Sequence, residues 1–221
     1  SAWAAPGRTI VLADIDAERA RATAAELREQ GAAAVVVIAD LRTAKGRQTL
    51  LDSTAPLPAL DVVVLNAGIS AFGPFARVPI SEQRAVYELN LLAPLALTNA
   101  LLAGQRIART GSVVMLASLG HFTGYPGASV YAATKSGLAA YARQLRLAYP
   151  WLAVLTVFPG PVRTAHARRY SPDNRREHRR MPPETLAEAI WAAVAERRST
   201  LLPGRAARAA AWLGRLLPGL S

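Results

Sequence analysis

The chain has 221 residues, of which 52% are hydrophobic and 19% are charged, so one folded domain with a sizeable core is predicted and a disordered chain is excluded. It has no cysteine, which excludes a disulfide scaffold, a cysteine-ligated zinc site and a thiol nucleophile. The net charge is +11, and only Lys45 and Lys135 are lysines. Such a charge indicates either a solvated arginine-rich surface or a protein that binds an anionic substrate, a nucleic acid or a membrane surface.

Short apolar runs alternate with helical stretches along the chain. In chain order the predicted elements are a strand at 9–14, a helix at 17–30, a strand at 33–39, a helix at 43–53, a strand at 61–65, a helix at 81–109, a strand at 112–117, a helix at 129–149, a strand at 152–158, a helix at 183–198, a short strand near Leu201 and a helix at 204–217. Asp16 is the predicted N-cap of the first helix, and Gly31 ends it.

This alternation predicts a doubly wound, Rossmann-like α/β domain over residues 1–221, with a parallel sheet covered on both faces. Residues 163–182 form a polar, arginine-rich insertion, and residues 204–221 form an amphipathic tail. In such sheets ligands bind outside the carboxyl ends of the strands. Polar or turn residues fall at those ends in this sequence: Asp14, Asp40, Asn66, Ser118 and Pro159-Gly160.

Tyr131 and Lys135 stand four residues apart in a predicted helix, so their side chains share one face. An isolated phenol has a pKa of about 10. A cation beside the phenolate lowers that pKa, which makes tyrosine usable as a general acid and base near neutrality. Ser118 ends a strand upstream, where its hydroxyl can bond a substrate oxygen. The alternative is a core tyrosine with a lysine at its rim.

Further motifs accompany this pair in the order that the predicted topology requires. They are Asn66-Ala67-Gly68 after the third strand, Asn90 in the long helix, and Pro159-Gly160 followed by Val162 and Thr164 after the fifth strand. Together with Ser118 and the Tyr-x-x-x-Lys spacing, they make the sequence resemble the short-chain dehydrogenase/reductase family along nearly its whole length.

The resemblance implies hydride transfer between NAD and an alcohol or carbonyl substrate, without a metal. It makes Tyr131 the general acid and base, with Lys135 lowering its pKa and holding the ribose. Ser118 would orient the carbonyl, and Asn90 would anchor a proton relay. The implied cofactor contacts are Asp14, Asp40, Asn66, Ala67, Gly68, Tyr131, Lys135, Pro159, Gly160, Val162 and Thr164.

Pro94 offers a physical reason for the relay. A helical proline donates no N–H to the carbonyl four residues earlier, which here belongs to Asn90. The freed carbonyl can bind water at a helix kink, which suits a relay through asparagine, lysine and water. The alternative is that Pro94 only bends a long helix.

Asp14 favours NAD over NADP as the cofactor. It ends the strand at which an acid accepts hydrogen bonds from the adenosine ribose and repels a 2′-phosphate. Ile15 follows it, where a phosphate-binding protein more often shows arginine. The alternative is an ordinary turn aspartate. Asp40 resembles the family's adenine contact.

The family's glycine-rich signature, Gly-x-x-x-Gly-x-Gly, occurs nowhere in the sequence. Residues 1–6 are interpreted as the last turn of the helix that should follow that loop. We therefore expect about twenty further residues, holding the first βα unit, before Ser1. Without that unit, the strands at 9–14 and 61–65 are expected either to flank an open slot or to close on one another. The alternative is a catalytically silent, basic binding or scaffold protein that has lost its dinucleotide loop.

The expected partner is a small alcohol or carbonyl compound in a homo-oligomeric, cytoplasmic enzyme. No basic leader and no apolar run of membrane-span length is visible. Nucleic acid is not expected, because no stacking aromatics interleave with the arginines. Three scattered histidines predict no metal site: His121, His166 and His178.

The substrate pocket is less readable. His121 and Tyr125 are expected to line it, or else to fill a loop. The insertion carries arginines that hint at an acidic substrate, unless they are simply solvated: Arg168, Arg169, Arg175 and Arg176. The tail holds an apolar set that can pack on its own domain, meet another subunit or lie on an anionic membrane: Ala210, Trp212, Leu213, Leu216, Leu217 and Leu220.

Overall fold

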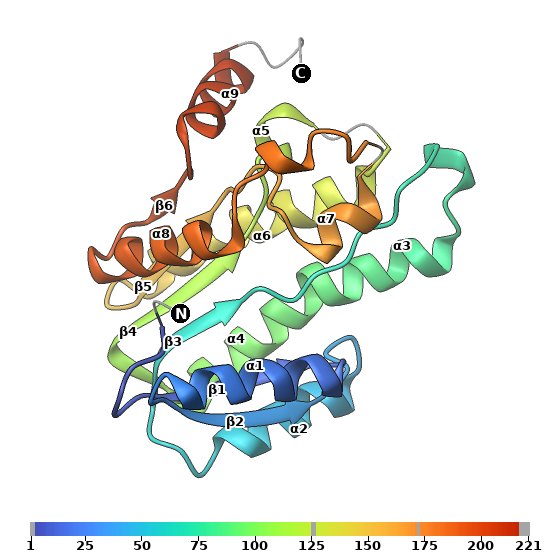
Figure 1. The fold of residues 1–221 in the computed structure, drawn as a ribbon. Helices are drawn as coiled ribbons and strands as arrows, with labels where there is room; N and C mark the ends of the chain where they lie inside the picture. The colour runs from blue at the N-terminus through green and yellow to red at the C-terminus, as the bar shows by residue number, and fades with distance from the viewer. Residues whose placement is uncertain (1–2, 125–126, 172, 217–221) are drawn as a thin grey trace.

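The computed structural model describes residues 3–124, 127–171 and 173–216, which form an α/β architecture (Figure 1). The strands lie in two sheets, one with the order β1-β2 and one with the order β3-β4-β5-β6. They are β1 (Thr9–Asp14), β2 (Ala33–Ile38), β3 (Leu60–Leu65), β4 (Ile107–Leu116), β5 (Ala153–Val157) and β6 (Thr200–Leu201). Every pairing between these strands is parallel, which confirms the predicted fold class.

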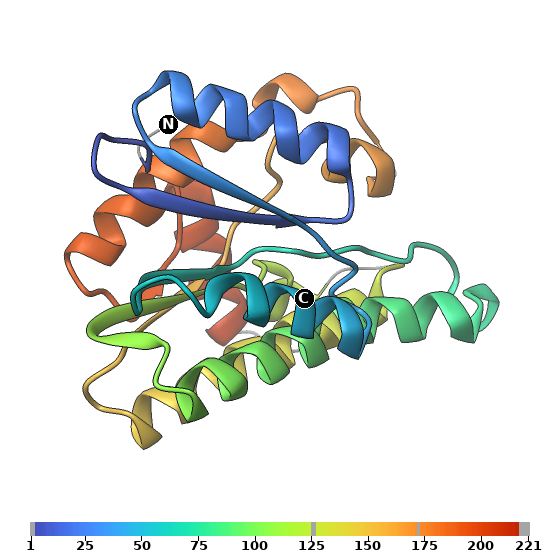
Figure 2. The same ribbon diagram turned by 90° about the horizontal axis from the view of Figure 1, so that it is seen from below.

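Helices cover both faces of the strands, as a doubly wound arrangement requires. They are α1 (Ala17–Glu29), α2 (Ala44–Thr54), α3 (Ile80–Tyr87), α4 (Ala93–Ala103), α5 (Gly120–Thr123), α6 (Ser129–Ala148), α7 (Ala165–Tyr170), α8 (Pro183–Ala195) and α9 (Arg205–Leu216), with 3-10 turns η1 (Phe75–Arg77) and η3 (Glu177–Arg179). Figure 2 shows α1 and α8 on one side of the strands and α2, α4 and α6 on the other.

Local signals set the ends of α1. The Asp16 carboxylate accepts a hydrogen bond from the Arg19 backbone N–H at 3.0 Å, which confirms the predicted N-cap. Gly31 follows the helix at φ +88°, in the left-handed region that glycine adopts without strain.

The long predicted helix is wrong at its C-terminal end. It stops at Ala103, and β4 already begins at Ile107, so Arg109 belongs to a strand. The Arg106 guanidinium donates to main-chain carbonyls between α2 and β3 at 2.8 and 2.5 Å, which fixes the chain beside β3. β4 then bulges, because its pairing with β3 shifts register between Leu60 and Val62.

The helix from Ile80 to Ala103 contains a π turn, η2 (Glu88–Leu92), at which the Ala93 N–H donates to the Glu88 carbonyl. Pro94 follows directly. A proline lacks the N–H that an α-helical turn needs, and the wider π turn accommodates it. The kink predicted at Pro94 is therefore a π turn.

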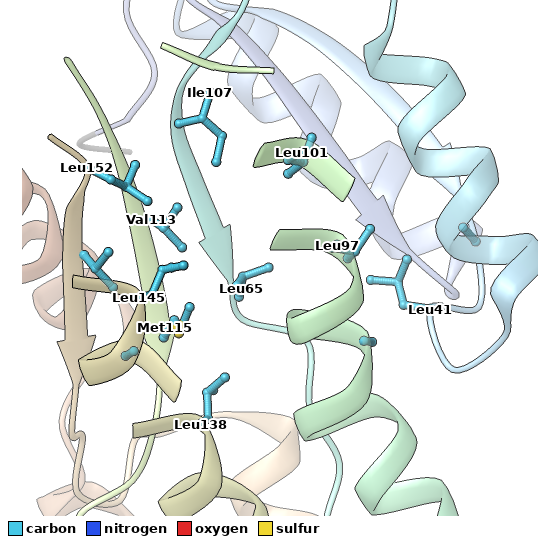
Figure 3. Close-up of a cluster of buried hydrophobic side chains, with 14 of the residues drawn as sticks. Leu41, Leu65, Leu97, Leu101, Ile107, Val113, Met115, Leu138, Leu145 and Leu152 are labelled. Atoms are coloured by element: carbon cyan, nitrogen blue, oxygen red, sulfur yellow. The ribbon is translucent and has the colours of Figure 1, made fainter. Parts of the chain in front are cut away.

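The same helix, Ile80–Ala103, is long and apolar enough to cross a membrane by length and composition, so the expectation that no segment reaches that length is wrong. Its buried side chains account for the apolar composition. Leu97 and Leu101 pack with Val113 and Met115 of β4 and with Leu138 of α6, as Figure 3 shows. The part of the helix that packs in this core is mainly α4, whose buried residues include Ala93, Leu97 and Leu101.

The first described residues do not form the predicted last turn of a helix. The Trp3 ring meets Trp191 of α8 edge-to-face at 4.9 Å, and the Arg8 guanidinium lies 4.3 Å over the same Trp191 ring. Arg8 also donates to the Trp3 carbonyl at 3.1 Å. This aromatic and cation–π packing holds the segment, which turns at Pro6 and Gly7, beside α8.

Among the described residues no hydrogen-bonded ladder joins β1 to β3. The two half-sheets therefore stay separate, and of the two expected alternatives the structure does not show direct closure. Val64 lies in the middle of β3 and is nevertheless 43% exposed, so part of this strand lacks the cover that a parallel strand normally has.

The insertion and the tail are more ordered than their composition indicates. Two of the insertion's arginines form ion pairs within it, Arg168 with Glu177 at 2.7 Å and Arg175 with Asp173 at 2.9 Å. In the tail, α9 buries Ala207 and Ala211 and leaves Trp212 and Leu213 exposed. Leu217 and Leu220 of the predicted apolar set lie outside the described residues.

Candidate active site

The site is built around Lys135, which lies in α6 and is only 4% exposed. Its ammonium Nζ donates a hydrogen bond of 2.6 Å to the Leu116 carbonyl at the end of β4. Burial lowers the pKa of this amine from 10.5 to about 8, because the charged form loses water. The side chain still carries its charge at neutral pH. An ammonium has three donors, so two remain for a ligand or water.

Asn90 connects two other parts of the site and is fully buried in the π turn. Its side-chain oxygen accepts from the Ile69 N–H at 2.9 Å, and its side-chain nitrogen donates to the Ile69 carbonyl at 2.8 Å. The same nitrogen reaches the Thr134 hydroxyl at 3.3 Å. The asparagine therefore holds the loop after β3 against α6. Since its side chain is engaged in this way, the predicted relay would use its main-chain carbonyl.

Gly68 shows how closely these groups approach. A Cβ at this position would lie 3.3 Å from the Asn90 side-chain oxygen and 3.5 Å from the Lys135 ammonium nitrogen. The Asn66-Ala67-Gly68 turn, Asn90 and Lys135 thus converge, as the sequence motifs predicted. Asn66 and Ala67 are exposed, which leaves their side of the turn open to a ligand.

Tyr131 lies one turn before Lys135 on α6 and is half-buried. The Lys135 nitrogen is 5.7 Å from the centre of the tyrosine ring. The ring of His166 from α7 is centred 6.2 Å from that of Tyr131, at an angle of 38°. A buried cation and an imidazole therefore both lie near the phenol ring.

Ser118 lies two residues beyond the carbonyl that Lys135 binds. Its hydroxyl oxygen accepts a hydrogen bond from the Gly120 N–H at 3.2 Å, where α5 begins. A hydroxyl held in this way keeps its proton for a substrate oxygen. Figure 1 shows α5 and α7 beyond the carboxyl ends of β4 and β5, the end at which ligands bind in this type of sheet.

Of the two predicted pocket residues, the structure describes only His121. The His121 ring nitrogen Nδ1 lies 3.0 Å from the Ser136 hydroxyl, and its ring packs on Phe122 and Phe158. This packing fits the alternative in which His121 fills a loop. Tyr125 lies outside the described residues.

The segment after β5 leads through the Pro159-Gly160 turn to helix α7, which lies at the site. The Pro159 carbonyl accepts from the Leu119 N–H at 3.0 Å, so the Pro159-Gly160 turn lies against the start of α5. Val162 then bridges to Met181, which closes the insertion on itself. Thr164 uses its hydroxyl to cap α7, accepting from the Ala167 N–H at 3.1 Å.

The two predicted adenosine-side carboxylates already have cationic partners. Asp14 accepts from Arg19 at 3.0 Å, a pair that sequence spacing alone did not single out. Asp40 binds Arg42 through both carboxylate oxygens, and these hydrogen bonds hold the pKa of Asp40 below its usual value despite partial burial. Arg19 is 63% exposed along its side chain, so a ligand at Asp14 meets both charges.

His166 is the site residue that sequence analysis missed as a functional group. The available signal was its position two residues after Thr164 in the segment that follows the Pro159-Gly160 turn. Only the tertiary structure shows that this position faces Tyr131.

Comparisons with known proteins agree with this arrangement. The family model for short chain dehydrogenases matches residues 1–175. Dehydrogenase/reductase SDR family member 7B of Xenopus laevis is 30% identical over 98% of this chain and 72% of that protein. The structure of a short-chain dehydrogenase from Sphingobium yanoikuyae in complex with NADPH has a TM-score of 0.80 and 25% identity, over 96% of this chain and 85% of that one.

A second structure, of a short-chain dehydrogenase/reductase from Burkholderia phymatum in complex with NAD, shares the fold with a TM-score of 0.84 and 21% identity, over 96% of this chain and 85% of that one. The chain spans 47%, 61% and 64% of the length of three curated relatives that it matches. A family match over residues 1–175, a fold of this likeness and a convergent Gly68–Asn90–Lys135 cluster lead to one conclusion. The chain belongs to the short-chain dehydrogenase/reductase family of oxidoreductases.

Proposed function

We propose that this protein oxidises alcohols or reduces carbonyl compounds with NAD(H), using Tyr131 as general acid and base. The observation that carries this proposal is the convergence of Gly68, Asn90 and Lys135 one helical turn from Tyr131. A buried lysine has no structural need to lie there, because taking a charge out of water destabilises the fold. A function that uses the charge explains its presence.

The chemistry of the residues supports a proton transfer at the substrate oxygen. In the direction of reduction, the Tyr131 hydroxyl gives its proton to the oxygen of the carbonyl. The Lys135 ammonium stabilises the phenolate that remains. Ser118 donates a second hydrogen bond to the same substrate oxygen. Protons then return to the phenol through Lys135 and water held at the Asn90 carbonyl.

The ribose side of a nicotinamide cofactor fits the residues present. Lys135 has donors to spare for ribose hydroxyls, and the Asn66-Ala67-Gly68 turn exposes two of its residues beside it. A bound nicotinamide would supply the hydride acceptor or donor. The glycine-rich loop that binds the pyrophosphate in dinucleotide-binding folds does not occur among these 221 residues.

Asp14 supports NAD as the preferred cofactor, since its carboxylate repels a 2′-phosphate. Arg19 reduces this repulsion, because it pairs with Asp14 at 3.0 Å and is itself largely exposed. The relatives whose structures were compared were solved with NADPH in one case and with NAD in the other. We therefore propose a preference for NAD that Arg19 moderates.

The test is an assay of reduced nicotinamide absorbance, with the protein expressed from its natural gene and a panel of secondary alcohols and ketones. We expect turnover with at least one member and tighter binding of NAD than of NADP. A protein that binds neither nucleotide and turns over no panel member would contradict the proposal. That result would favour the catalytically silent binding protein instead.

A further inference from the structure

His166 is placed against the catalytic tyrosine by a rigid local device. Helix α7 starts directly after the Pro159-Gly160 segment, with Thr164 as its hydrogen-bonded N-cap. His166 lies in the first turn of this helix, and its ring is centred 4.9 Å from that of Tyr170, one turn later. The Tyr170 ring supports the imidazole from behind, and the imidazole faces Tyr131 at 6.2 Å.

The imidazole is half-buried, and within the described residues the structure gives it ring contacts but no hydrogen bond to protein. Its charged form is disfavoured by burial first, then by the charges of Lys135 and Arg169, so the pKa of His166 lies below 6.5. The phenols that face it, on Tyr131 and Tyr170, are uncharged near neutral pH. At neutral pH the ring is thus a neutral group with one N–H donor and one acceptor nitrogen.

A half-buried polar group without a protein partner is normally satisfied by water or by a ligand. A substrate whose reacting oxygen reaches Tyr131 comes close to His166, because the centres of the two rings are 6.2 Å apart. An oxygen on a neighbouring carbon of that substrate would accept from the imidazole N–H. A substrate that presents only hydrocarbon there would displace water and leave the donor unpaired, which weakens its binding.

We propose that His166 is a specificity-determining residue that hydrogen-bonds a second oxygen of the substrate, so that dicarbonyl and hydroxycarbonyl compounds are preferred over simple ketones. This inference rests on the proposed function, since it concerns the substrate of the same reaction. His166 acts beside Tyr131 and does not replace it as the acid or base.

The test uses matched ketone pairs that differ only in the second oxygen: diacetyl against butanone, and benzil against deoxybenzoin. The quantity compared is the ratio of kcat/KM within each pair, for wild type, His166→Phe and His166→Gln. Phenylalanine keeps the ring packing and removes the hydrogen bond, and glutamine keeps a donor. Tyr170→Phe is the matched control, because it keeps the ring behind His166.

We expect His166→Phe to lower the ratio of kcat/KM for the dicarbonyl to that for the simple ketone about tenfold in at least one pair. The change should arise mainly from a higher KM of the dicarbonyl substrate, as the loss of one hydrogen bond predicts. His166→Gln should retain most of the ratio, and Tyr170→Phe should leave it unchanged. Intact turnover with the same ratio in His166→Phe, or a wild type that favours the simple ketone in every pair, would overturn the inference and leave the proposed function standing. No turnover of any of these ketones by a wild type that also binds neither nucleotide would overturn both.

Discussion

Replacing Lys135 by methionine should make the folded protein more stable at neutral pH while removing its activity. Methionine has similar length, no charge and a preference for buried positions. The lowering of the Lys135 pKa from 10.5 to about 8 means that the folded state holds the lysine proton less tightly than the unfolded chain does. One pKa unit is worth 1.36 kcal/mol, so the buried charge costs about 3 kcal/mol of stability.

The sign of the pH dependence follows from this difference. Below pH 8 both states are protonated, and the full cost is present. Between pH 8 and 10.5 the folded state releases its proton before the unfolded chain does, so the cost falls with rising pH. Above 10.5 both states are neutral and the cost has vanished. The lost hydrogen bond to the Leu116 carbonyl offsets part of the gain at neutral pH by about 1.5–3 kcal/mol.

The assay is urea unfolding followed by the fluorescence of the four tryptophans, repeated across pH. The free energy of unfolding of wild type, relative to Lys135→Met, should rise by about 3 kcal/mol from about pH 7 to about pH 11. Lys45, the other lysine, is exposed, so Lys45→Met is the control and should show no such change relative to wild type. A difference that stays flat with pH would refute the reasoning, because the ammonium would then not be desolvated.

Three further predictions concern the cofactor, the serine and the tail. Asp14→Ala should reduce the preference for NAD over NADP by about tenfold, and Arg19→Ala should increase it by about tenfold. Calorimetric titrations of both nucleotides measure this preference. A wild type that prefers NADP would contradict this account. Ser118→Ala should lower kcat by about a hundredfold with unchanged cofactor affinity, whereas near-normal kcat would remove the serine from the mechanism. The double substitution Trp212→Ser and Leu213→Ser should reduce the oligomer mass measured by light scattering. If the mass is unchanged and the substitution instead removes a salt-sensitive binding to anionic vesicles, these exposed residues form a membrane contact.

The elements with strong local signals were predictable from sequence. The continuous valines of β2 and β3 mark buried parallel strands, and Asp16 caps α1 because its carboxylate bonds the backbone within the same turn. The family resemblance also placed Asn90 and Lys135 in one site, and the Asn66-Ala67-Gly68 segment could be placed there because a parallel sheet brings the carboxyl ends of its strands to one edge.

The remaining features depend on contacts between distant segments. The start of β4 is set by Arg106, whose guanidinium binds carbonyls 49 and 52 residues away. The course of the first residues is set by the Trp3 contact with Trp191. His166 gains its position from the fold of the insertion, and no local pattern marks a side chain that meets Tyr131 only in the folded chain. Tertiary contacts of this kind override local propensity.

The central claim is that Tyr131 is the acid and base of a nicotinamide-dependent reaction, and Tyr131→Phe tests it most directly. The substitution keeps the ring that packs near Lys135 and His166 and removes only the hydroxyl. The two measurements on the protein expressed from its natural gene are steady-state turnover and the dissociation constant of the cofactor. We predict turnover reduced by about a hundredfold to ten-thousandfold with cofactor affinity nearly unchanged. Turnover close to that of wild type would contradict the account.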